Sequence, residues 1–382
     1  MGRRTPGPAA AFGDGSRQRS GRLSVAWRAG RPDPRHGKRA QLRKRLCLGP
    51  RRRFRRYQRH GPPQACGSPV SRFIDIAGNL LPEGASVEDI SAPDGARLRA
   101  AFFPAEHARG TVVLVTGWSE FIEKYFETVR DLQARNLNVA MMDWRGQGLS
   151  DRDSARAMKW SGYFETLKED LRHFTEHHVK PRFAAPYILM THSMGGLPGL
   201  MLLAEGYEGF SRAVLCAPMT RLFPELQNKV IAFAASAACA FGFANTETAR
   251  SRDHSEAFEG NIFTSDKTRH ARFRDLKLAA PEAASTTPTY GWVKAAMMDS
   301  ANIHAPGALA GIKVPVLIIS AGNEQQIDGA DHAIIAASSD KISQQVIPGA
   351  LHEIMMERDA IRALYFKAFD DFVAPVLQVD SR

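Results

Sequence analysis

Residues 187–200 read Y-I-L-M-T-H-S-M-G-G-L-P-G-L. The apolar run Tyr187–Met190 predicts a buried strand, and the residues after Gly195 have the pattern of a helix. A strand, a tight turn that carries one serine, here Ser193, and then a helix form the layout of a nucleophile elbow, which raises a hydroxyl above the carboxyl end of a sheet. Thr191 stands where this pattern usually begins with glycine. We therefore interpret Ser193 as a candidate nucleophile, with a serine in an ordinary loop as the alternative.

The chain has 382 residues, of which 44% are hydrophobic. This length suits one large α/β domain with an insertion, or two domains, and the apolar fraction can fill a sizeable core. No apolar run approaches the roughly 20 residues that a helix needs to span a bilayer. Four cysteines are scattered without pairing or metal-binding spacing, at Cys47, Cys66, Cys216 and Cys239. They favour a reducing compartment, so we expect a cytoplasmic protein, either free or peripheral on the inner membrane.

The positive charge of the chain is concentrated near its N-terminus. The whole chain carries +11, but residues 1–60 alone carry +17 and the remainder −6. Residues 1–70 are rich in Arg, Gly and Pro without a helical or strand period, which predicts a disordered tail. A patch for nucleic acid or an anionic membrane and an organelle transit peptide are two interpretations, whereas a secretory signal lacks its apolar region. We favour a third, upstream sequence translated from a misassigned start ahead of Val70, so nucleic acid is not an expected partner.

Strand and helix patterns alternate between residues 86 and 216. Pro93-Asp94-Gly95 predicts a hairpin turn between two strands, and the β-branched run Thr111–Val115 is typical of a strand buried on both faces. Strands are predicted at residues 87–90, 98–103, 111–115, 138–142, 187–190 and 213–216, and helices at 125–135 and 161–178. This alternation indicates a parallel sheet with right-handed crossovers. Such sheets bind ligands at the carboxyl ends of their strands, where Ser193 is expected.

Residues 219–302 interrupt the alternation and show no strand pattern. They contain the apolar stretch Val230–Phe243, the charged stretch Phe263–Leu276 and the aromatic-containing stretch Tyr290–Met298. We expect a helical cap over the active site, with an apolar face toward an acyl chain or a bilayer surface. An ordinary helical subdomain is the alternative. Strands at residues 314–320 and 343–347 then resume the sheet, and an amphipathic helix at 361–373 follows.

A serine hydroxyl becomes a nucleophile when a base removes its proton and a carboxylate orients that base. In this type of sheet the chain order is serine, acid, histidine. His352 lies in a loop between the last strand and the last helix, which makes it the expected base. The loop after the strand at 314–320 holds two candidate acids, and we favour Glu324, nearer to the strand, over Asp328. His192, beside the nucleophile, is expected to support the elbow and not to act as a second base.

An oxyanion hole needs two backbone N–H groups. The first belongs to the residue after the nucleophile, Met194. For the second we choose Trp118, in the loop after the strand at 111–115, because Gly117 before it allows a close approach of the backbone. No zinc or Cys-pair spacing, Walker P-loop or dinucleotide-binding Gly fingerprint is found, so neither a metal nor a cofactor is expected. The Gly-rich run Asp143–Gly148 lacks the Lys of a phosphate loop and is interpreted as a structural turn.

Taken together, these residues resemble a known family. Gly117–Tyr125 is similar to the oxyanion segment of bacterial lysophospholipases, and Asp143–Ser150 to a signature that these share with monoacylglycerol lipases. Further matches lie at residues 191–196, 264–266, 290–293 and 350–358, so the resemblance covers residues 75–375 in order. On these residues the chain is identified as an α/β-hydrolase of the bacterial lysophospholipase and monoacylglycerol lipase type, in the serine aminopeptidase-like hydrolase family.

The resemblance implies an α/β-hydrolase fold, with a mostly parallel sheet, helices on both faces and a helical cap inserted before the acid-bearing strand. The core would comprise residues 75–218 and 303–375, and the cap residues 219–302. The resemblance also implies a triad of Ser193, Glu324 and His352 that cleaves carboxylic esters of glycerol-type lipids. The chain departs from the family pattern at Thr191, where glycine is usual, and at Glu324, where aspartate is commoner. The basic tail has no counterpart in the family.

Other functions stay open at this point. The same fold can act on a small aryl ester, a thioester or an N-terminal amide. The two departures keep a catalytically impaired, ligand-binding protein as an alternative from another class, and nucleic-acid binding through the tail is a further one. Because a fold does not determine a substrate, neither the acyl-chain length nor the head group is predicted. The oligomeric state is not predicted either.

Overall fold

The computed structural model describes residues 72–152, 162–248, 257–284 and 287–377. The disorder predicted for residues 1–70 concerns a segment outside these ranges. Within them, no helix combines the length and the apolarity that crossing a membrane requires.

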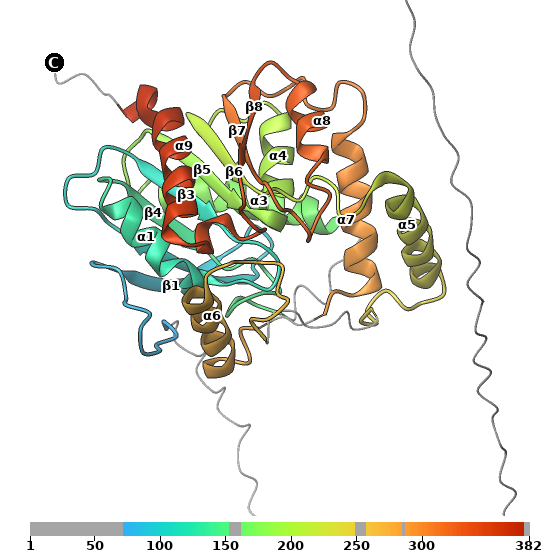
Figure 1. Ribbon diagram of the computed structural model, residues 1–382, viewed down its shortest axis with the longest axis horizontal. Coiled ribbons are helices and arrows are strands. Elements are labelled where there is room, and N and C mark those ends of the chain that lie inside the picture. Colours follow the sequence, from blue (N-terminus) through green and yellow to red (C-terminus); the bar gives the residue numbers. More distant parts are fainter. Residues whose placement is uncertain (1–71, 153–161, 249–256, 285–286, 378–382) are drawn as a thin grey trace, which may run out of the picture. The chain divides into compact units, whose positions relative to one another are not determined.

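One sheet organises the described residues (Figure 1). Its strands are β1 (Ser86–Ser91), β2 (Arg97–Phe103), β3 (Thr111–Val115), β4 (Asn138–Met142), β5 (Tyr187–His192), β6 (Arg212–Cys216), β7 (Val316–Ala321) and β8 (Ile342–Ile347). Their order in the sheet is β1-β2-β4-β3-β5-β6-β7-β8. β2 pairs antiparallel with β1 and β4, and all other pairs are parallel. The predicted, mostly parallel sheet is therefore confirmed.

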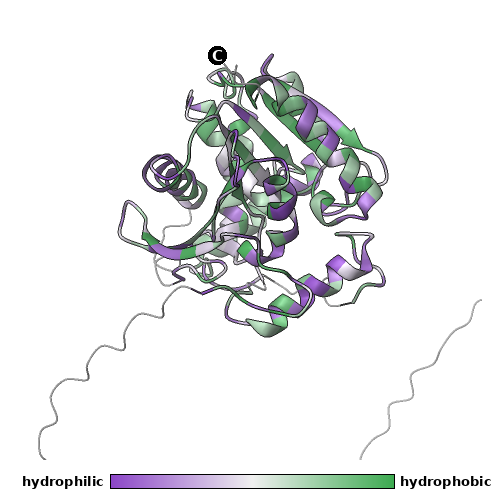
Figure 2. Ribbon diagram, turned by 90° about the vertical axis from the view of Figure 1, so that its left-hand side faces the viewer, coloured by the Kyte–Doolittle hydropathy of each residue, from purple (hydrophilic) through white to green (hydrophobic). Residues whose placement is uncertain are grey.

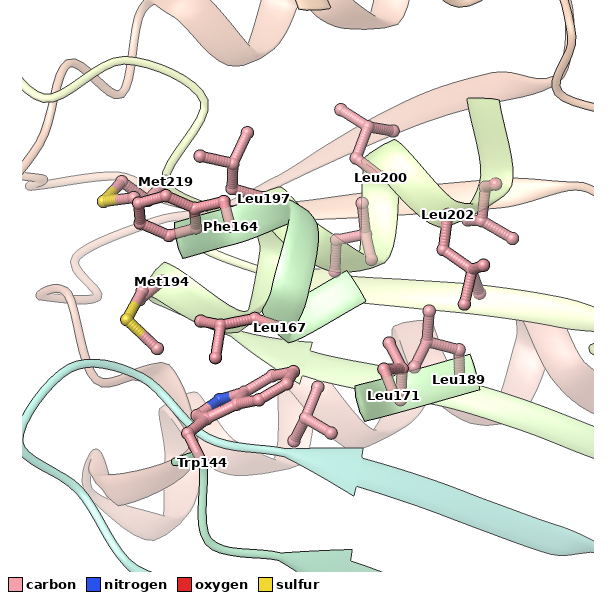
Figure 3. Packing of buried hydrophobic residues seen from close by; sticks show 14 of the residues in the cluster. Trp144, Phe164, Leu167, Leu171, Leu189, Met194, Leu197, Leu200, Leu202 and Met219 are labelled. Atoms are coloured by element: carbon pink, nitrogen blue, oxygen red, sulfur yellow. The ribbon is translucent and has the colours of Figure 1, made fainter. Parts of the chain in front are cut away.

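Helices cover both faces of this sheet. They are α1 (Phe126–Gln133), α3 (Tyr163–Phe174), α4 (Gly196–Ala204), α8 (Asp331–Ala337) and α9 (Asp359–Leu377). On one face, α1 and α9 bury apolar side chains such as Val129 and Phe369. On the other face, α3, α4 and α8 contribute side chains such as Leu171, Leu200 and Ile335, and Figure 3 shows part of this packing. The two-faced covering predicted for an α/β fold is confirmed.

The central strands are apolar along their whole length. Every residue of β3 and of β4 is buried. Helices cover both faces of the sheet, so a polar side chain on either face of these strands would be cut off from water. The strands at the centre of the sheet are accordingly green in Figure 2, whereas the surrounding helices carry both green and purple. The loops that leave the carboxyl ends of β3, β5, β7 and β8 therefore start from a rigid platform.

A helical insertion separates β6 from β7. In its described part it contains α5 (Glu225–Ala240), α6 (Lys267–Ala279) and α7 (Tyr290–Ile303). Asp266 and Thr289 cap the N-termini of α6 and α7, each accepting a backbone N–H with its side chain. α7 packs against α5, α3 and α4. α6 stands apart from these helices in Figure 1, and its Leu276 joins a small apolar cluster with Ile74 and Phe121.

Candidate active site

Ser193 stands in a sharp turn at the carboxyl end of β5. β5 lies between β3 and β6 in the middle of the sheet, and α4 starts three residues after Ser193. The φ of Ser193 is 46°, a left-handed conformation that costs a non-glycine residue about 1–2 kcal/mol. The Met219 N–H holds the turn by donating to the Ser193 carbonyl at 2.8 Å. Strain of this kind is typical of an elbow that exposes its nucleophile.

The close approach of α4 to the sheet requires small residues. A Cβ on Gly196 would lie 2.4 Å from the Cβ of Pro218, which no side chain tolerates. A Cβ on Gly199 would lie 3.2 Å from Cγ2 of Thr191. The methyl group that Thr191 adds to the elbow therefore occupies the space that a glycine in α4 leaves free. This contact explains how the elbow accommodates a threonine at its first position.

His352 lies between Ser193 and Glu324. Its Nε2 is 2.9 Å from Oγ of Ser193, and its Nδ1 is 2.8 Å from Oε2 of Glu324. The ring is 3% exposed. A serine, an imidazole and a carboxylate in one hydrogen-bonded row can transfer the serine proton to the imidazole and stabilise the imidazolium that forms. The structure thus brings together the three side chains that the sequence analysis selects.

Glu324 follows β7 and is held by the backbone of its own loop. Its Oε1 accepts the N–H groups of residues 325–327. Burial of the carboxyl opposes its ionisation, but the attraction of His352 and these N–H groups outweighs burial, and the pKa of Glu324 lies below its ordinary value of 4.5. Asp328, the alternative acid, is turned toward Arg221, whose Nη1 is 3.9 Å from its Oδ2. The contact with His352 is therefore made by Glu324.

The loop after β3 is fixed on both sides of Trp118. The Gly117 N–H donates to Oε2 of Glu120 at 2.5 Å, and the Ser119 N–H donates to a glutamine side chain at 2.6 Å. Between them, the Trp118 N–H donates to no protein acceptor in the part of the chain that the structure describes. Met194 lies in the first turn of the helix after Ser193, where N–H groups have no preceding carbonyl. Both N–H groups selected for an oxyanion hole remain able to bind a ligand oxygen.

The helical insertion contacts two of the loops that surround Ser193. Trp292 of α7 packs on Trp118, with ring centroids 4.6 Å apart. Phe263 faces the His352 ring edge-on at 6.5 Å, and its carbonyl accepts the N–H of Glu353 at 2.8 Å. The insertion therefore touches both the loop after β3 and the loop after β8.

The Gly-rich run that begins at Asp143 stabilises the fold around the site. Oδ2 of Asp143 is 2.6 Å from Nη2 of the buried Arg99, and its two oxygens accept the N–H groups of Ile122 and Leu149. A Cβ on Gly148 would lie 2.1 Å from the same carboxylate. The run thus organises a turn around one buried charge, which fits its interpretation as a structural turn.

One cluster of acidic side chains has the spacing of potential metal ligands, and it lies on α3 and at the end of α4. Within the described ranges, Glu165, Glu169 and Glu205 form the single group of potential ligands close enough to share an ion. These carboxylates already bind Lys168 and Arg172. The acidic group is therefore explained by ion pairs between α3 and the end of α4.

A set of buried charges behind Ser193 was not predicted from the sequence. Glu120 and Lys124 are 4% and 2% exposed, and Glu353, next to His352, completes the set with an ion pair to Lys124 at 2.6 Å. The signal available in the sequence is a Glu and a Lys four residues apart in a stretch that otherwise buries Phe121 and Ile122. Spacing of this kind is common on exposed helices, so it does not indicate burial.

Comparisons with known proteins show the family of the chain. A family model described as serine aminopeptidase, S33, matches residues 106–359. The chain is 28% identical over 298 residues to lysophospholipase L2 of Escherichia coli strain K12, covering 74% of this chain and 86% of that protein. It is 24% identical over 276 residues to a probable lysophospholipase L2 of Haemophilus influenzae, covering 71% of this chain and 85% of that protein.

Solved structures share the architecture at low sequence identity. A soluble variant of monoglyceride lipase from Saccharomyces cerevisiae, in complex with a substrate analog, has a TM-score of 0.62 at 19% identity and covers 76% of this chain and 96% of its own. A carboxyl esterase from Bacillus coagulans has a TM-score of 0.58 at 17% identity and covers 77% and 99%. These likenesses confirm the predicted α/β-hydrolase fold.

Proposed function

Because the chain belongs to the serine aminopeptidase S33 family, we propose that it is a serine hydrolase that cleaves carboxylic esters of glycerol-type lipids, as a lysophospholipase or a monoacylglycerol lipase. The observation that carries this proposal is the hydrogen-bonded row of Ser193, His352 and Glu324. The relatives named lysophospholipase L2, and the fold neighbour named monoglyceride lipase, support a lipid ester as the substrate.

In the first half-reaction the hydroxyl of Ser193 attacks the ester carbonyl while Nε2 of His352 takes its proton. The oxyanion accepts the N–H groups of Trp118 and Met194. Donors of this kind are worth about 3–4 kcal/mol each in serine hydrolases. Glu324 keeps Nδ1 of His352 protonated and stabilises the imidazolium. The ester bond to the alcohol then breaks, and the alcohol leaves with the proton from His352.

In the second half-reaction water replaces the alcohol. Nε2 of His352 takes a proton from the water, whose oxygen attacks the acyl-Ser193 carbonyl, and the same two N–H groups hold the oxyanion. The bond to Oγ of Ser193 breaks, His352 returns the proton to Oγ, and the fatty acid leaves. Every proton transfer is made by one imidazole, which is why its orientation by Glu324 matters in both halves.

We assign the helical insertion to substrate access and α5 to contact with the lipid phase. Leu226, Val230 and Phe233 are 78%, 62% and 77% exposed, and their spacing of four and three residues places them on one helix face. Such a face inserts at the boundary between head groups and acyl chains. Together with the free thiols of Cys216 and Cys239, this supports a peripheral position on the cytoplasmic side of the inner membrane.

The test is the variant Ser193→Ala, with a fluorophosphonate probe as the second readout. Turnover of a monoacylglycerol and of a lysophospholipid should fall by about 10⁶-fold, the scale of a triad nucleophile, and labelling should disappear. Ser211→Ala is the control, because Ser211 is a partly buried serine in the loop before β6 and should keep both signals. Turnover that survives in a folded Ser193→Ala protein refutes the proposal.

A further inference from the structure

A cluster of buried ionisable residues lies directly behind Ser193. It consists of Glu120, Lys124, Tyr125, His192 and Glu353, and we call it the Glu120 cluster. The first four residues are at most 4% exposed, and the side chain of Glu353 is 12% exposed. Burying charges to this extent is costly unless they are paired and hydrogen-bonded. The contacts of the cluster therefore define its charge states.

Glu120 lies at the centre of the cluster and is surrounded by donors. Its Oε2 accepts the Gly117 N–H at 2.5 Å and the Tyr125 hydroxyl at 2.6 Å, and its Oε1 accepts Nζ of Lys124 at 2.6 Å. Nδ1 of His192 lies 3.1 Å from Oε1 and 3.2 Å from Oε2. Burial opposes ionisation, but Lys124 and His192 outweigh it and hold the pKa of Glu120 well below its ordinary value. Glu120 is therefore a carboxylate.

Both ring nitrogens of His192 face oxygen acceptors. Nδ1 faces the Glu120 carboxylate, and Nε2 lies 3.3 Å from the carbonyl oxygen of His352. A neutral imidazole has one N–H, so one of its nitrogens would direct a lone pair at an oxygen. The imidazolium donates to both oxygens. Burial opposes this charge, but the Glu120 carboxylate outweighs burial and raises the pKa of His192 above its ordinary value of 6.5.

The charges that face His192 balance when it is an imidazolium. Glu120 and Glu353 are negative, and Lys124, with Nζ 2.6 Å from an oxygen of each, is positive. His192 supplies the second positive charge. A neutral His192 would leave one net negative charge in a space that excludes water, which is unfavourable.

Two further ionisable groups around His192, Cys216 and Tyr125, carry no charge in the resting state. Cys216 stands beside it in the register of β5 and β6, and burial raises the pKa of this thiol well above its ordinary value. Burial likewise raises the pKa of the Tyr125 hydroxyl well above its ordinary value. The His352 ring, whose centroid is 5.1 Å from that of His192, has a carboxylate partner of its own in Glu324.

The contacts of Glu120 and His192 connect the cluster to the residues to which we assign catalytic roles. Glu120 holds Gly117, the residue before Trp118, and His192 is itself the residue before Ser193. The carbonyl that His192 binds belongs to His352. We propose that His192, as an imidazolium, is a positioning residue that holds the loops of Trp118 and His352 in register with Ser193. This inference rests on the proposed function, because the registration matters for a reaction at Ser193.

The charge state of His192 can be measured without turnover, by ¹⁵N NMR of its ring nitrogens in the wild-type protein. His192→Gln assigns the resonances. Both nitrogens should carry protons at pH 7 and lose one as the pH rises through a value above 6.5. His332 is the internal control, because its Nδ1 faces the hydroxyl of Ser320 at 2.8 Å and burial lowers its pKa, so it should be neutral. A neutral His192 at pH 7 overturns the inference.

Two variants separate the two hydrogen bonds of the His192 ring. The amide N–H of Asn reaches the position of Nδ1, toward Glu120, and that of Gln reaches the position of Nε2, toward the His352 carbonyl. With a short, water-soluble ester, His192→Asn and His192→Gln should each lower kcat by about 10–100-fold, the scale of a 1 Å misalignment. KM should stay within about twofold, because no substrate contact is removed. In the wild type, kcat should fall at alkaline pH as His192 loses its proton. Neither variant should show this fall.

The control variant is His332→Gln, which also removes a buried imidazole but contacts neither loop. It should lower the melting temperature while leaving kcat within about threefold of the wild type. If folded His192 variants keep wild-type kcat, the inference is overturned while the proposed function stands. If Ser193→Ala retains turnover, both are overturned, and the two failures are thus distinguishable.

Discussion

α4 and α5 are two apolar helices with opposite surroundings. α4, behind Ser193, buries every residue except Met201 and Ala204. α5, in the insertion, buries Ala235 alone of its sixteen residues. Both helices are rich in apolar residues, but α4 is enclosed by the protein, whereas α5 packs on α7 along one side and leaves apolar residues such as Leu226 and Phe233 exposed. Among the described residues, the sheet and its helices thus bury their apolar side chains, whereas the insertion leaves an apolar face of α5 exposed.

This difference assigns separate tasks to the two regions. The residues proposed for catalysis lie on loops of the sheet, where packing on both faces fixes their positions. The insertion reaches these loops through Trp292 and Phe263, but contributes no member of the triad. Changes in the sheet region should therefore affect the chemical step, and changes in α5 should affect access to lipid.

After Ser193→Ala, the largest effect should follow from Glu324→Gln, within the sheet region. The amide keeps the shape of the side chain but removes the charge that stabilises the imidazolium of His352, and the loss of this charge in a serine protease triad costs about 10⁴-fold in kcat. We expect a fall of about 10³–10⁴-fold in kcat for both lipid and short soluble esters. Steady-state kinetics on the two kinds of substrate measure it.

Asp328→Asn is the matched control for this variant. Asp328 lies four residues further along the same loop and faces Arg221 instead of His352, so kcat should change by less than about threefold. The reverse result, an active Glu324→Gln and an inactive Asp328→Asn, would transfer the acid role to Asp328. If kcat fell for the lipid ester alone, Glu324 would act in substrate access, and the division of tasks between the sheet region and the insertion would be wrong.

The sheet was predictable from sequence because its signals are local. The strands predicted at residues 111–115 and 138–142 coincide with β3 and β4, whose residues are apolar without interruption because helices lie on both sides. The order in which a serine, an acid and a histidine follow successive strands pointed to Ser193 and His352, since parallel strands bring their carboxyl ends to one edge. It left two acids, of which Glu324 was favoured over Asp328 because it is nearer to the strand.

Other features depend on contacts that sequence periodicity does not encode. α8 was not predicted because it is short, and its first two residues, Asp331 and His332, are buried polar groups. The helix predicted at residues 230–243 begins five residues earlier, at Glu225, because exposed apolar residues such as Leu226 do not mark an inward face. The role of Glu120 was not predictable either, because its partner His192 lies 72 residues away in the sequence, at the end of β5.

An intermediate effect should follow from changes at the joint between the two regions. Glu127 of α1 accepts the guanidinium groups of Arg269 and Arg272 of α6 and of Arg362 of α9. Burial opposes its ionisation, but the three arginines outweigh burial and lower the pKa of Glu127 to about 2. Glu127→Gln should lower the free energy of unfolding by about 1–3 kcal/mol, the range of hydrogen bonds to charged groups, as measured by urea denaturation at neutral pH.

The pH dependence gives this prediction its sign. Since the folded pKa of Glu127 is below the ordinary 4.5, its contribution is present above pH 4.5 and is lost as the pH falls toward about 2. The difference in stability between wild type and Glu127→Gln should shrink over this window. The control is Asp370→Asn, on the same surface, which removes the ion pair between Arg135 and the half-exposed Asp370. It should lower the free energy of unfolding by at most about 0.5 kcal/mol. A pH-independent difference would contradict the ionic origin of the joint.

The smallest effect on the chemical step, and the sharpest test of the comparison, should come from α5. Replacing Leu226, Val230 and Phe233 together by Ser removes three apolar side chains from an exposed face. Labelling of the active serine by a fluorophosphonate and kcat on a soluble ester should stay within about twofold of the wild type. Partition to phospholipid vesicles, measured by co-sedimentation, should fall by about 10–100-fold, because each side chain contributes about 1 kcal/mol or more when buried in lipid.

Leu364→Ser on α9, on the other side of the sheet in Figure 1, is the control and should leave partition unchanged. Vesicle binding that survives the triple substitution would show that the apolar face of α5 serves another partner, and unfolding would show that α5 belongs to the same cooperative core as α4.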